Sequence, residues 1–306
     1  MSIRFDDRVV IVTGAGAGLG RSHALAFAER GAKVLVNDFG GAVDGSGASS
    51  AVAEKVAEEI RAAGGQAISH GADVSNAEQV TDMVSQAMAQ WGRVDALVNN
   101  AGILRDASFA KMELNDFRKV LEVHVMGSVI CSKAVWQIMR EQNYGRILMT
   151  TSSSGLYGNF GQSNYGAAKM AVIGLMNVLQ LEGEKNNIRV NALAPGAATR
   201  MTESLLPPGV SELMKPEAVT PAALFLVSED APRRTILCAT AGGFSRTLIH
   251  ETEGVFIAES ERTPEAIAAR FDEISDTSGQ HLYTEGAGQV MKFMTKAAQA
   301  AGVRPS

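Results

Sequence analysis

Residues 164–169, with the sequence NYGAAK, place a tyrosine and a lysine four positions apart. If this segment opens a helix, the side chains of Tyr165 and Lys169 lie on one face of it. A tyrosine has an ordinary pKa of about 10, too high for easy proton exchange at neutral pH, and a neighbouring ammonium group lowers that pKa. The two residues could therefore be a proton donor and the group that tunes it. The alternative is a solvated pair of the kind that is common on helix surfaces.

A serine precedes this pair. Ser152 lies thirteen residues before Tyr165, in the segment LMTTSSSG that ends a predicted strand. Its hydroxyl could hold a substrate oxygen while the tyrosine takes the substrate's proton and a hydride leaves for a nicotinamide ring. Ser152 and Tyr165 are thus the candidate substrate-binding residues.

A glycine-rich turn in VVIVTGAGAGLGRSHALAF is the second candidate site. It does not satisfy G-x-G-x-x-G, because position 19 is leucine, but Gly14, Gly18 and Gly20 satisfy G-x-x-x-G-x-G. Glycines let the backbone turn sharply and approach a pyrophosphate, whose charge favours the N-terminus of the following helix. The alternative is a tight strand-to-helix turn that binds nothing.

Polar and small residues follow three further predicted strands. Asp38 ends the second strand, 20 residues beyond Gly18, where a carboxylate can accept hydrogen bonds from the hydroxyls of an adenosine ribose. Its charge would repel the additional phosphate of NADP, so the sequence favours NAD; the alternative is a loop acid that binds its own backbone. The other residues in such positions are Asp73 and Val74 after the third strand, and Asn99, Asn100, Ala101 and Gly102 after the fourth.

Short apolar runs alternate with longer helical patterns. The predicted strands are Val9–Val12, Val34–Val36, Ala67–Ser69, Val94–Val98, Arg146–Met149, Arg189–Leu193 and Ile236–Ala239. The predicted helices are Leu19–Arg30, Ser49–Ala63, Asn76–Trp91, Asn115–Glu141, Tyr165–Lys185 and Pro216–Ser228. The strands are almost wholly apolar, which is typical of strands covered on both faces. The alternation predicts an α/β fold with a doubly wound parallel sheet, which binds ligands at the carboxyl ends of its strands.

The chain departs from this alternation in two places. Residues 40–48, GGAVDGSGA, form a glycine-rich loop that we expect to be mobile. After about residue 250 the strand pattern stops, and Pro264–Ile274 and Gly288–Ala301 are predicted as helices. The sequence therefore predicts an NAD-binding domain over 1–250 and a helical extension over 251–306. The extension has too few apolar residues for a core of its own, so we expect it to pack on the sheet domain.

The composition narrows the classes of partner. The 306 residues carry a formal net charge of −5 without a block rich in lysine or arginine, which argues against nucleic acid and anionic membrane surfaces. No apolar run reaches the ~20 residues that a membrane-spanning helix needs. Cys131 and Cys238 have no ligand-like spacing, so neither a metal site nor a disulfide is expected. With no secretory pattern and no usual peroxisomal signal in GVRPS, the sequence predicts a cytoplasmic protein.

Taken together, the motifs resemble the short-chain dehydrogenase/reductase family. TGAGAGLG, NNAG, the serine thirteen residues before the tyrosine, YGAAK and APG occur in that family's order over residues 5–245. The resemblance implies a Rossmann-type sheet of about seven strands, a small-molecule substrate, and Ser152, Tyr165 and Lys169 as catalytic residues. It also implies that the helices over 115–141 and 165–185 pair across a two-fold axis, giving a homodimer or a homotetramer.

The family resemblance adds residues to the cofactor site. It implies that Lys169 holds the nicotinamide ribose, that Asn99 lies along the cofactor and that Thr199 reaches the nicotinamide carboxamide. The predicted cofactor-binding residues are therefore Gly14, Gly18, Leu19, Gly20, Asp38, Asp73, Val74, Asn99, Ala101, Gly102, Tyr165, Lys169 and Thr199.

Longer segments point to a subgroup of the family. VNDFGG, NNAGILRDASFAKM, SSGLYGNFGQSNYGAAK and RVNALAPGAATRMT resemble the (3R)-hydroxyacyl-CoA dehydrogenase part of peroxisomal multifunctional enzymes type 2, also called 17-beta-hydroxysteroid dehydrogenases type 4. This resemblance implies NAD-dependent conversion of a (3R)-3-hydroxyacyl-CoA to a 3-ketoacyl-CoA. The alternative is a hydroxysteroid dehydrogenase. A 3-oxoacyl carrier-protein reductase and a non-catalytic NAD(H) sensor are further hypotheses.

One position departs from the wider family. Many members have an asparagine in the helix VLEVHVMGS, where it supports a water in a proton relay, and this chain has His124. A histidine could hold the same water or shuttle the proton. The alternative is a packed, neutral histidine with a backbone partner.

The segment after APG, residues 197–221, covers the substrate in the family. Its apolar side chains indicate an adaptable wall; they are Met201, Leu205, Leu206, Leu213 and Met214. Arg105, Lys111 and Arg200 could meet the phosphates of coenzyme A, although lone surface cations are usually solvated.

Overall fold

The computed structural model describes residues 2–47, 49, 51–198, 209 and 211–303. The chain divides into two compact units, Met1–Arg246 and Thr247–Ser306, and each is described by itself. Among the described residues, no helix combines the length and the apolar character that crossing a bilayer requires.

Eight strands form one sheet, in the order β3-β2-β1-β4-β5-β6-β7-β8. They are β1 Val9–Thr13, β2 Lys33–Asn37, β3 Gln66–His70, β4 Ala96–Asn99, β5 Gly145–Thr150, β6 Ile188–Gly196, β7 Ile236–Thr240 and β8 Gly243–Thr247. The pairings from β3 to β7 are parallel. The predicted α/β, doubly wound parallel sheet is therefore confirmed, and each of the seven predicted strands is present.

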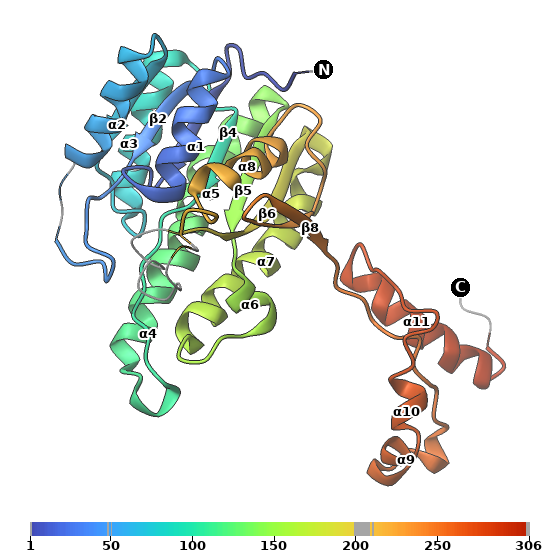
Figure 1. The fold of residues 1–306 in the computed structure, drawn as a ribbon. Coiled ribbons are helices and arrows are strands. Elements are labelled where there is room, and N and C mark those ends of the chain that lie inside the picture. Colours follow the sequence, from blue (N-terminus) through green and yellow to red (C-terminus); the bar gives the residue numbers. More distant parts are fainter. Residues whose placement is uncertain (1, 48, 50, 199–208, 210, 304–306) are drawn as a thin grey trace. The chain divides into compact units, whose positions relative to one another are not determined.

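Helices cover both faces of the sheet (Figure 1). The described helices of this unit are α1 Gly18–Glu29, α2 Ala51–Ala62, α3 Ala77–Trp91, α4 Leu114–Leu121, α5 Gly127–Gln142, α6 Ser153–Tyr157, α7 Ser163–Gly183 and α8 Thr220–Leu226, with short 3-10 turns at Phe109–Lys111, Glu184–Asn186 and Pro216–Ala218. Of these, α1, α2 and α8 pack on one face of the sheet and α3, α5 and α7 on the other. Successive side chains of a strand point to opposite faces. Val10 and Val12 of β1 accordingly enter a core shared with α1, α2 and α8, whereas Ile11 enters a core shared with α3, α5 and α7. The carboxyl ends of the strands are thus held between two helical layers.

The strand β8 lies outside the predicted strands. It follows β7 after only Ala241 and Gly242, whose φ values of 49° and 80° suit a two-residue hairpin turn. Its sequence, GFSRT, is almost wholly exposed. A solvated edge strand has no apolar run, which is why the sequence pattern does not mark it.

The predicted helix over 115–141 is interrupted. A π-helical segment, η2 Glu122–Met126, separates α4 from α5. Such single π turns inside helices are frequent at functional sites. The extra residue places His124 inside the protein, where it is 3% exposed.

The C-terminal unit contains α9 Pro264–Ala269, α10 Phe271–Ile274, α11 Gly286–Ala300 and a 3-10 turn at Glu259–Glu261. None of its described residues is buried. Ion pairs tie α11 to the chain before it, from Lys292 to Glu251 at 2.6 Å and from Lys296 to Glu253. The lack of buried residues agrees with the small number of apolar residues in this part of the sequence. Its predicted packing on the sheet domain stays a prediction.

The buried imidazole of His23 makes stability depend on pH. It lies between α1 and α8, with Nδ1 2.8 Å from the hydroxyl of Thr220, and burial lowers its pKa from 6.5 to about 4. The unfolded chain then binds a proton at a higher pH than the folded one, so this stability is complete above pH ~6.5 and is lost as the pH falls through ~4. We expect the free energy of unfolding to decrease by about 3 kcal/mol over that window on account of His23.

Urea unfolding at pH 7 and pH 4 tests this expectation by comparing the parent protein with His23→Gln. The variant should lose about 3 kcal/mol less than the parent between the two pH values. His250→Gln, at an exposed position, serves as the control and should follow the parent. Parallel losses in parent and His23→Gln would contradict the assignment.

Candidate active site

Hydrogen bonds join the glycine-rich turn after β1 to the end of β4. The hydroxyl of Thr13 accepts hydrogen bonds from the backbone N–H groups of Asn100 and Ala101 at 3.0 and 3.1 Å. The Asn100 side chain donates to the carbonyl oxygens of Thr13 and Gly14 at 2.9 and 3.0 Å. A Cβ atom at Gly14 would lie 2.7 Å from the Ala101 Cα, and Gly14 has a φ of 63°. Only glycine therefore fits this position.

Local geometry also explains why the other two positions of the motif, 18 and 20, are glycine. Gly18 has a φ of 54°, which glycine adopts without strain. A Cβ atom at Gly20 would overlap the carbonyl oxygen of Gly14. The turn delivers the backbone directly into the N-terminus of α1, where the helix dipole favours a negative charge.

Asp38 at the end of β2 has a defined set of partners. One carboxylate oxygen accepts from the N–H of Gly16 at 2.8 Å and the other from the N–H of Gly40 at 2.7 Å. Each oxygen retains acceptor capacity, because a carboxylate has about four acceptor sites. The side chain can therefore still receive a vicinal pair of hydroxyl groups, such as those of a ribose.

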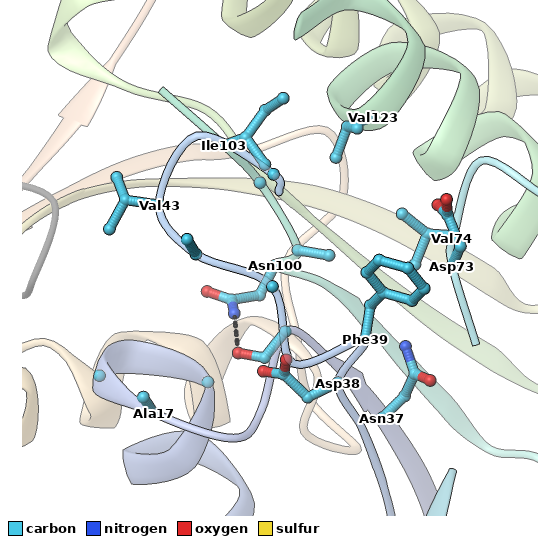
Figure 2. A pocket seen from close by; sticks show the side chains of 18 of the residues that line it. Ala17, Asn37, Asp38, Phe39, Val43, Asp73, Val74, Asn100, Ile103 and Val123 are labelled. Carbon is cyan, nitrogen blue, oxygen red and sulfur yellow. Dashed lines mark hydrogen bonds between the residues drawn. The ribbon is translucent and has the colours of Figure 1, made fainter. Parts of the chain in front are cut away.

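A cavity of about 470 Å³ opens above the glycine turn (Figure 2). The predicted cofactor residues that line it are Gly14, Gly18, Leu19, Gly20, Asp38, Asp73, Val74, Ala101 and Gly102. Its size, its small-residue floor and the acid at one end fit a dinucleotide. This fit rests on the glycine cradle, in which added Cβ atoms would occupy the space or collide with the backbone.

Asn99 does not line this cavity, in contrast to the prediction. Its side chain is 5% exposed and donates to the hydroxyl of Ser132 at 3.2 Å. The neighbouring Asn100 lines the cavity instead. Successive residues at a strand end point to opposite sides, so only one of the two asparagines can face the cavity.

The glycine-rich loop after β2 is anchored, although the sequence predicts a mobile segment. Leu104 N–H donates to the carbonyl of Val43 at 3.0 Å, and Arg105 Nε donates to the carbonyl of Asp44 at 2.8 Å. The Arg105 guanidinium also pairs with Asp116 of α4 at 2.6 Å. Arg105 is therefore engaged within the protein and is not a free cation for a coenzyme A phosphate. Lys111 is exposed.

Ser152, Tyr165 and Lys169 come together at the carboxyl end of β5. Ser152 caps α6, accepting from the N–H of Ser154 at 3.1 Å, and its hydroxyl lies close enough to Tyr165 to lower the pKa of the tyrosine. The Lys169 ammonium lies 5.4 Å from the centre of the Tyr165 ring and donates to the carbonyl of Thr150 at 2.7 Å. The spacing in sequence thus produces one compact group of three side chains. None of the three is among the residues that line the cavity.

Burial dominates the protonation of this group. It raises the pKa of Tyr165 to about 12, and the hydrogen bond from Ser152 opposes the rise. It lowers the pKa of Lys169 to about 7. The expected lowering of the tyrosine pKa is not seen, because burial of the Tyr165 hydroxyl itself is the largest effect and raises the pKa.

His124 lies between the cavity and the catalytic group. A Cβ atom at Gly102 would overlap its ring, and its ring centre is 5.3 Å from that of Tyr165. Burial and the charge of Lys169 lower its pKa to about 3, so the ring is neutral. Nε2 is 2.8 Å from the carbonyl oxygen of Ile103, and Nδ1 has no hydrogen-bond partner among the described protein groups. This is the packed histidine with a backbone partner; a part in a proton relay stays a prediction.

Part of the predicted substrate end lies outside the described residues. Thr199, Arg200, Met201, Leu205 and Leu206 belong to that part. Leu213 is exposed, and the carbonyl of Met214 accepts from the N–H of Ala198 at 2.6 Å. This backbone hydrogen bond therefore joins residue 198 to residue 214, both within the 197–221 segment.

Comparison with known proteins agrees with this geometry. The model of the family described as "short chain dehydrogenase" matches residues 8–208. Peroxisomal multifunctional enzyme type 2 of Mus musculus is 44% identical over 99% of this chain and 42% of its own length. The chain thus spans less than half of that relative.

Two solved structures are similar to the chain. Full-length peroxisomal multifunctional enzyme type 2 of Drosophila melanogaster has a TM-score of 0.81 and 35% identity, over 97% of this chain and 50% of that one. A 7α-hydroxysteroid dehydrogenase complexed with NADH and 7-oxo glycochenodeoxycholic acid has a TM-score of 0.71 and 32% identity, over 78% and 95%.

The comparison contradicts the predicted cytoplasmic location, because the mouse and fly relatives are named as peroxisomal enzymes. The prediction rested on the lack of a secretory pattern and of a usual peroxisomal signal, and the lack of a recognised signal does not identify a compartment.

Replacement of Tyr165 by phenylalanine tests the catalytic group. The ring and its packing against His124 remain, but the hydroxyl that exchanges the proton is lost. We expect kcat for alcohol oxidation to decrease about a thousandfold, with NADH affinity within about twofold of the parent. Steady-state kinetics and calorimetry measure the two quantities. Tyr144→Phe, which precedes β5 at the opposite end of the sheet, is the matched control. A Tyr165→Phe enzyme with parental kcat would contradict the assignment.

Proposed function

The chain belongs to the short chain dehydrogenase family, and from that premise we propose that it oxidises (3R)-3-hydroxyacyl-CoA to 3-ketoacyl-CoA with NAD. As a member, it is an oxidoreductase that acts on CH–OH groups. The finer proposal names the substrate and the preferred dinucleotide. It is supported by the match to multifunctional enzyme type 2 over almost the whole chain.

One observation carries the reaction type: Ser152 and Lys169 both lie beside Tyr165. Ser152 holds the substrate oxygen, and the cap contact from the Ser154 N–H orients its hydroxyl. In the oxidation direction Tyr165 acts as a phenolate: it first releases its own proton to solvent and then accepts the proton of the substrate alcohol as the hydride leaves. In the reverse direction its neutral hydroxyl donates that proton to the ketone oxygen. In that direction, the ketone oxygen accepts hydrogen bonds from the same two hydroxyl groups, those of Ser152 and Tyr165. A bound nicotinamide supplies the acceptor or donor of the hydride.

Lys169 has a supporting role in the proposal. Its ammonium group is held by the Thr150 carbonyl, and the Thr151 hydroxyl donates to the Lys169 carbonyl at 2.5 Å. The lysine therefore keeps a fixed distance from Tyr165. Burial lowers its pKa to about 7, so its charge changes near neutral pH.

The cofactor is NAD(H) in this proposal. The family match and the similar structure solved with NADH support it. Asp38 supports NAD over NADP, because its carboxylate already receives two backbone N–H groups and remains charged where the additional phosphate would lie.

A hydroxysteroid dehydrogenase is the second candidate function. The similarity to the 7α-hydroxysteroid dehydrogenase favours it. A non-catalytic NAD(H) sensor has less support, since the chain retains the serine, tyrosine and lysine in contact with one another.

The predicted homodimer or homotetramer is part of the proposal. Three apolar side chains on α7 are half-exposed, namely Met170, Val178 and Leu181. A helix face of this kind suits pairing with a second copy.

Calorimetry with NADH and NADPH tests the role of Asp38. We expect the parent to bind NADH about 100-fold more tightly than NADPH, because a carboxylate close to a phosphate repels it. Asp38→Ser removes the charge and should narrow that ratio at least about tenfold. Asp82→Asn, an exposed acid on α3, should leave the ratio unchanged. Equal affinities in the parent would overturn the argument for NAD.

Rates on three alcohols test the substrate. The enzyme is assayed for NAD reduction with a (3R)-3-hydroxyacyl-CoA, with its (3S) epimer and with a 17-hydroxysteroid. We expect the (3R) thioester to have a kcat/KM at least about tenfold above the other two. A preference for the steroid would favour the second candidate, and NADH binding without oxidation of any alcohol would favour the sensor.

A further inference from the structure

Asp106 is a solvent-exposed acid held beside the catalytic group. Its Oδ2 accepts from Gln162 Nε2 at 2.7 Å. Gln162 is 9% exposed, and its amide oxygen accepts from the hydroxyl of Ser154 at 2.7 Å and from the side chain of Asn159 at 3.1 Å. Since the amide oxygen serves two donors, the amide nitrogen must face Asp106. The carboxylate is therefore fixed in place by a nearly buried residue.

The backbone keeps Asp106 close to Tyr165. Ala107 pairs with Gln162 in an isolated parallel bridge, and its N–H donates to the carbonyl of Gly161 at 2.9 Å. On the other side, the Asn164 side chain donates to the carbonyl of Arg105 at 2.8 Å. The chain at 105–107 thus runs along the start of α7. The charge of Asp106 acts on Tyr165, where it adds to the rise in pKa.

Among the described residues, no cationic side chain forms an ion pair with Asp106. The adjacent Arg105 turns away to Asp116 and to the backbone of Asp44. An aspartate without a cationic partner at neutral pH presents a net negative charge to whatever binds next to it.

We propose that Asp106 is a specificity-determining residue that excludes substrates with a free carboxylate two carbon–carbon bonds from the reacting carbon and admits the same acids as esters or thioesters. This inference rests on the proposed function. It assigns to the site a class of substrate, neutral 3-hydroxyacyl esters and thioesters, and a class that the site rejects, free 3-hydroxy acids.

The covalent structure of the substrate explains why the discrimination is strong. In a 3-hydroxy acid only two carbon–carbon bonds of about 1.5 Å separate the carboxyl carbon from the carbinol carbon. With the alcohol oxygen on Ser152 and Tyr165, a free carboxylate stays near the catalytic group in either orientation of the chain. It therefore meets the negative charge of Asp106, and repulsion between like charges weakens its binding. An ester or thioester carries no charge there.

The test compares two substrates that differ in charge alone. Methyl (3R)-3-hydroxybutyrate and (3R)-3-hydroxybutyrate are assayed with NAD, and the ratio of their kcat/KM values is measured for the parent and for Asp106→Asn. Asparagine has the same shape and its amide oxygen still accepts from Gln162. We expect the ratio of ester to acid to fall about tenfold in Asp106→Asn, mainly because the acid improves. Glu58→Gln, an exposed change of charge on α2, should keep the parental ratio.

Ionic strength supplies a second measurement. Because Asp106 is exposed, added salt screens its field, so the ratio should decrease with salt in the parent and stay nearly flat in Asp106→Asn. NADH calorimetry on the variant shows whether it is folded.

Each other outcome counts against the inference. A parent that oxidises the free acid as well as the ester overturns it, as does an unchanged ratio in Asp106→Asn. A folded variant that loses the ester activity as well would make Asp106 a positioning residue and would also overturn it. A parent that oxidises neither compound nor a (3R)-3-hydroxyacyl-CoA overturns the proposed function and this inference with it.

Discussion

The hydrogen bonds between Asn100 and the first turn are the constraint on which the site depends. Through them the end of β4 is fixed to Thr13 and Gly14, so the glycine cradle and the chain that follows β4 cannot move independently. That chain, residues 101–107, then meets His124, the loop after β2, and the start of α7. One short segment thereby sets the position of the cofactor cavity relative to the catalytic tyrosine. Polar groups buried at a sheet edge are effective in this way because each must be satisfied in a single geometry.

Desolvation decides the electrostatics of the site. Tyr165, Lys169 and His124 all shift toward their neutral forms, and the attraction of a lysine for a phenolate is too weak to reverse this in the protein as described. The site is therefore built so that charge is unfavourable until a ligand brings its own. A neutral tyrosine, a lysine that titrates near neutrality and a neutral histidine are poised to respond to a charged cofactor, in the sense that small changes in their surroundings move protons.

The sheet and the proximity of Ser152, Tyr165 and Lys169 could be predicted because they follow from local patterns, whereas the catalytic role of the three residues stays a prediction. Apolar runs such as Val9–Thr13 need burial on both faces, and Tyr165 and Lys169 share a helix face at any helical geometry. The features that could not be predicted depend on partners distant in sequence. Asn99 and Asn100 are the same residue type and differ only in the side of the strand end to which each side chain points. The π turn at His124, the anchoring of the loop by Arg105 and the exposed strand β8 likewise have no signature in spacing. The cytoplasmic location was wrong for a different reason: it was inferred from the lack of a secretory pattern and of a usual peroxisomal signal, and the lack of a recognised signal does not identify a compartment.

Asp38 and Asp106 illustrate two uses of the same chemical group on one edge of the sheet. Each is fixed by donors from the protein, two backbone N–H groups for Asp38 and the Gln162 amide for Asp106. For Asp38 the charge is useful twice, since a carboxylate attracts ribose hydroxyls and repels a phosphate in their place. For Asp106 only the repulsion matters, because nothing in the proposed substrate needs to donate to it. Discrimination through repulsion needs a charge that is held still and is not paired with a cation, and Arg105, which pairs with Asp116, does not neutralise Asp106. The pairing of Arg105 therefore contributes to selectivity although its guanidinium group points away from the catalytic group, toward the loop after β2 and α4.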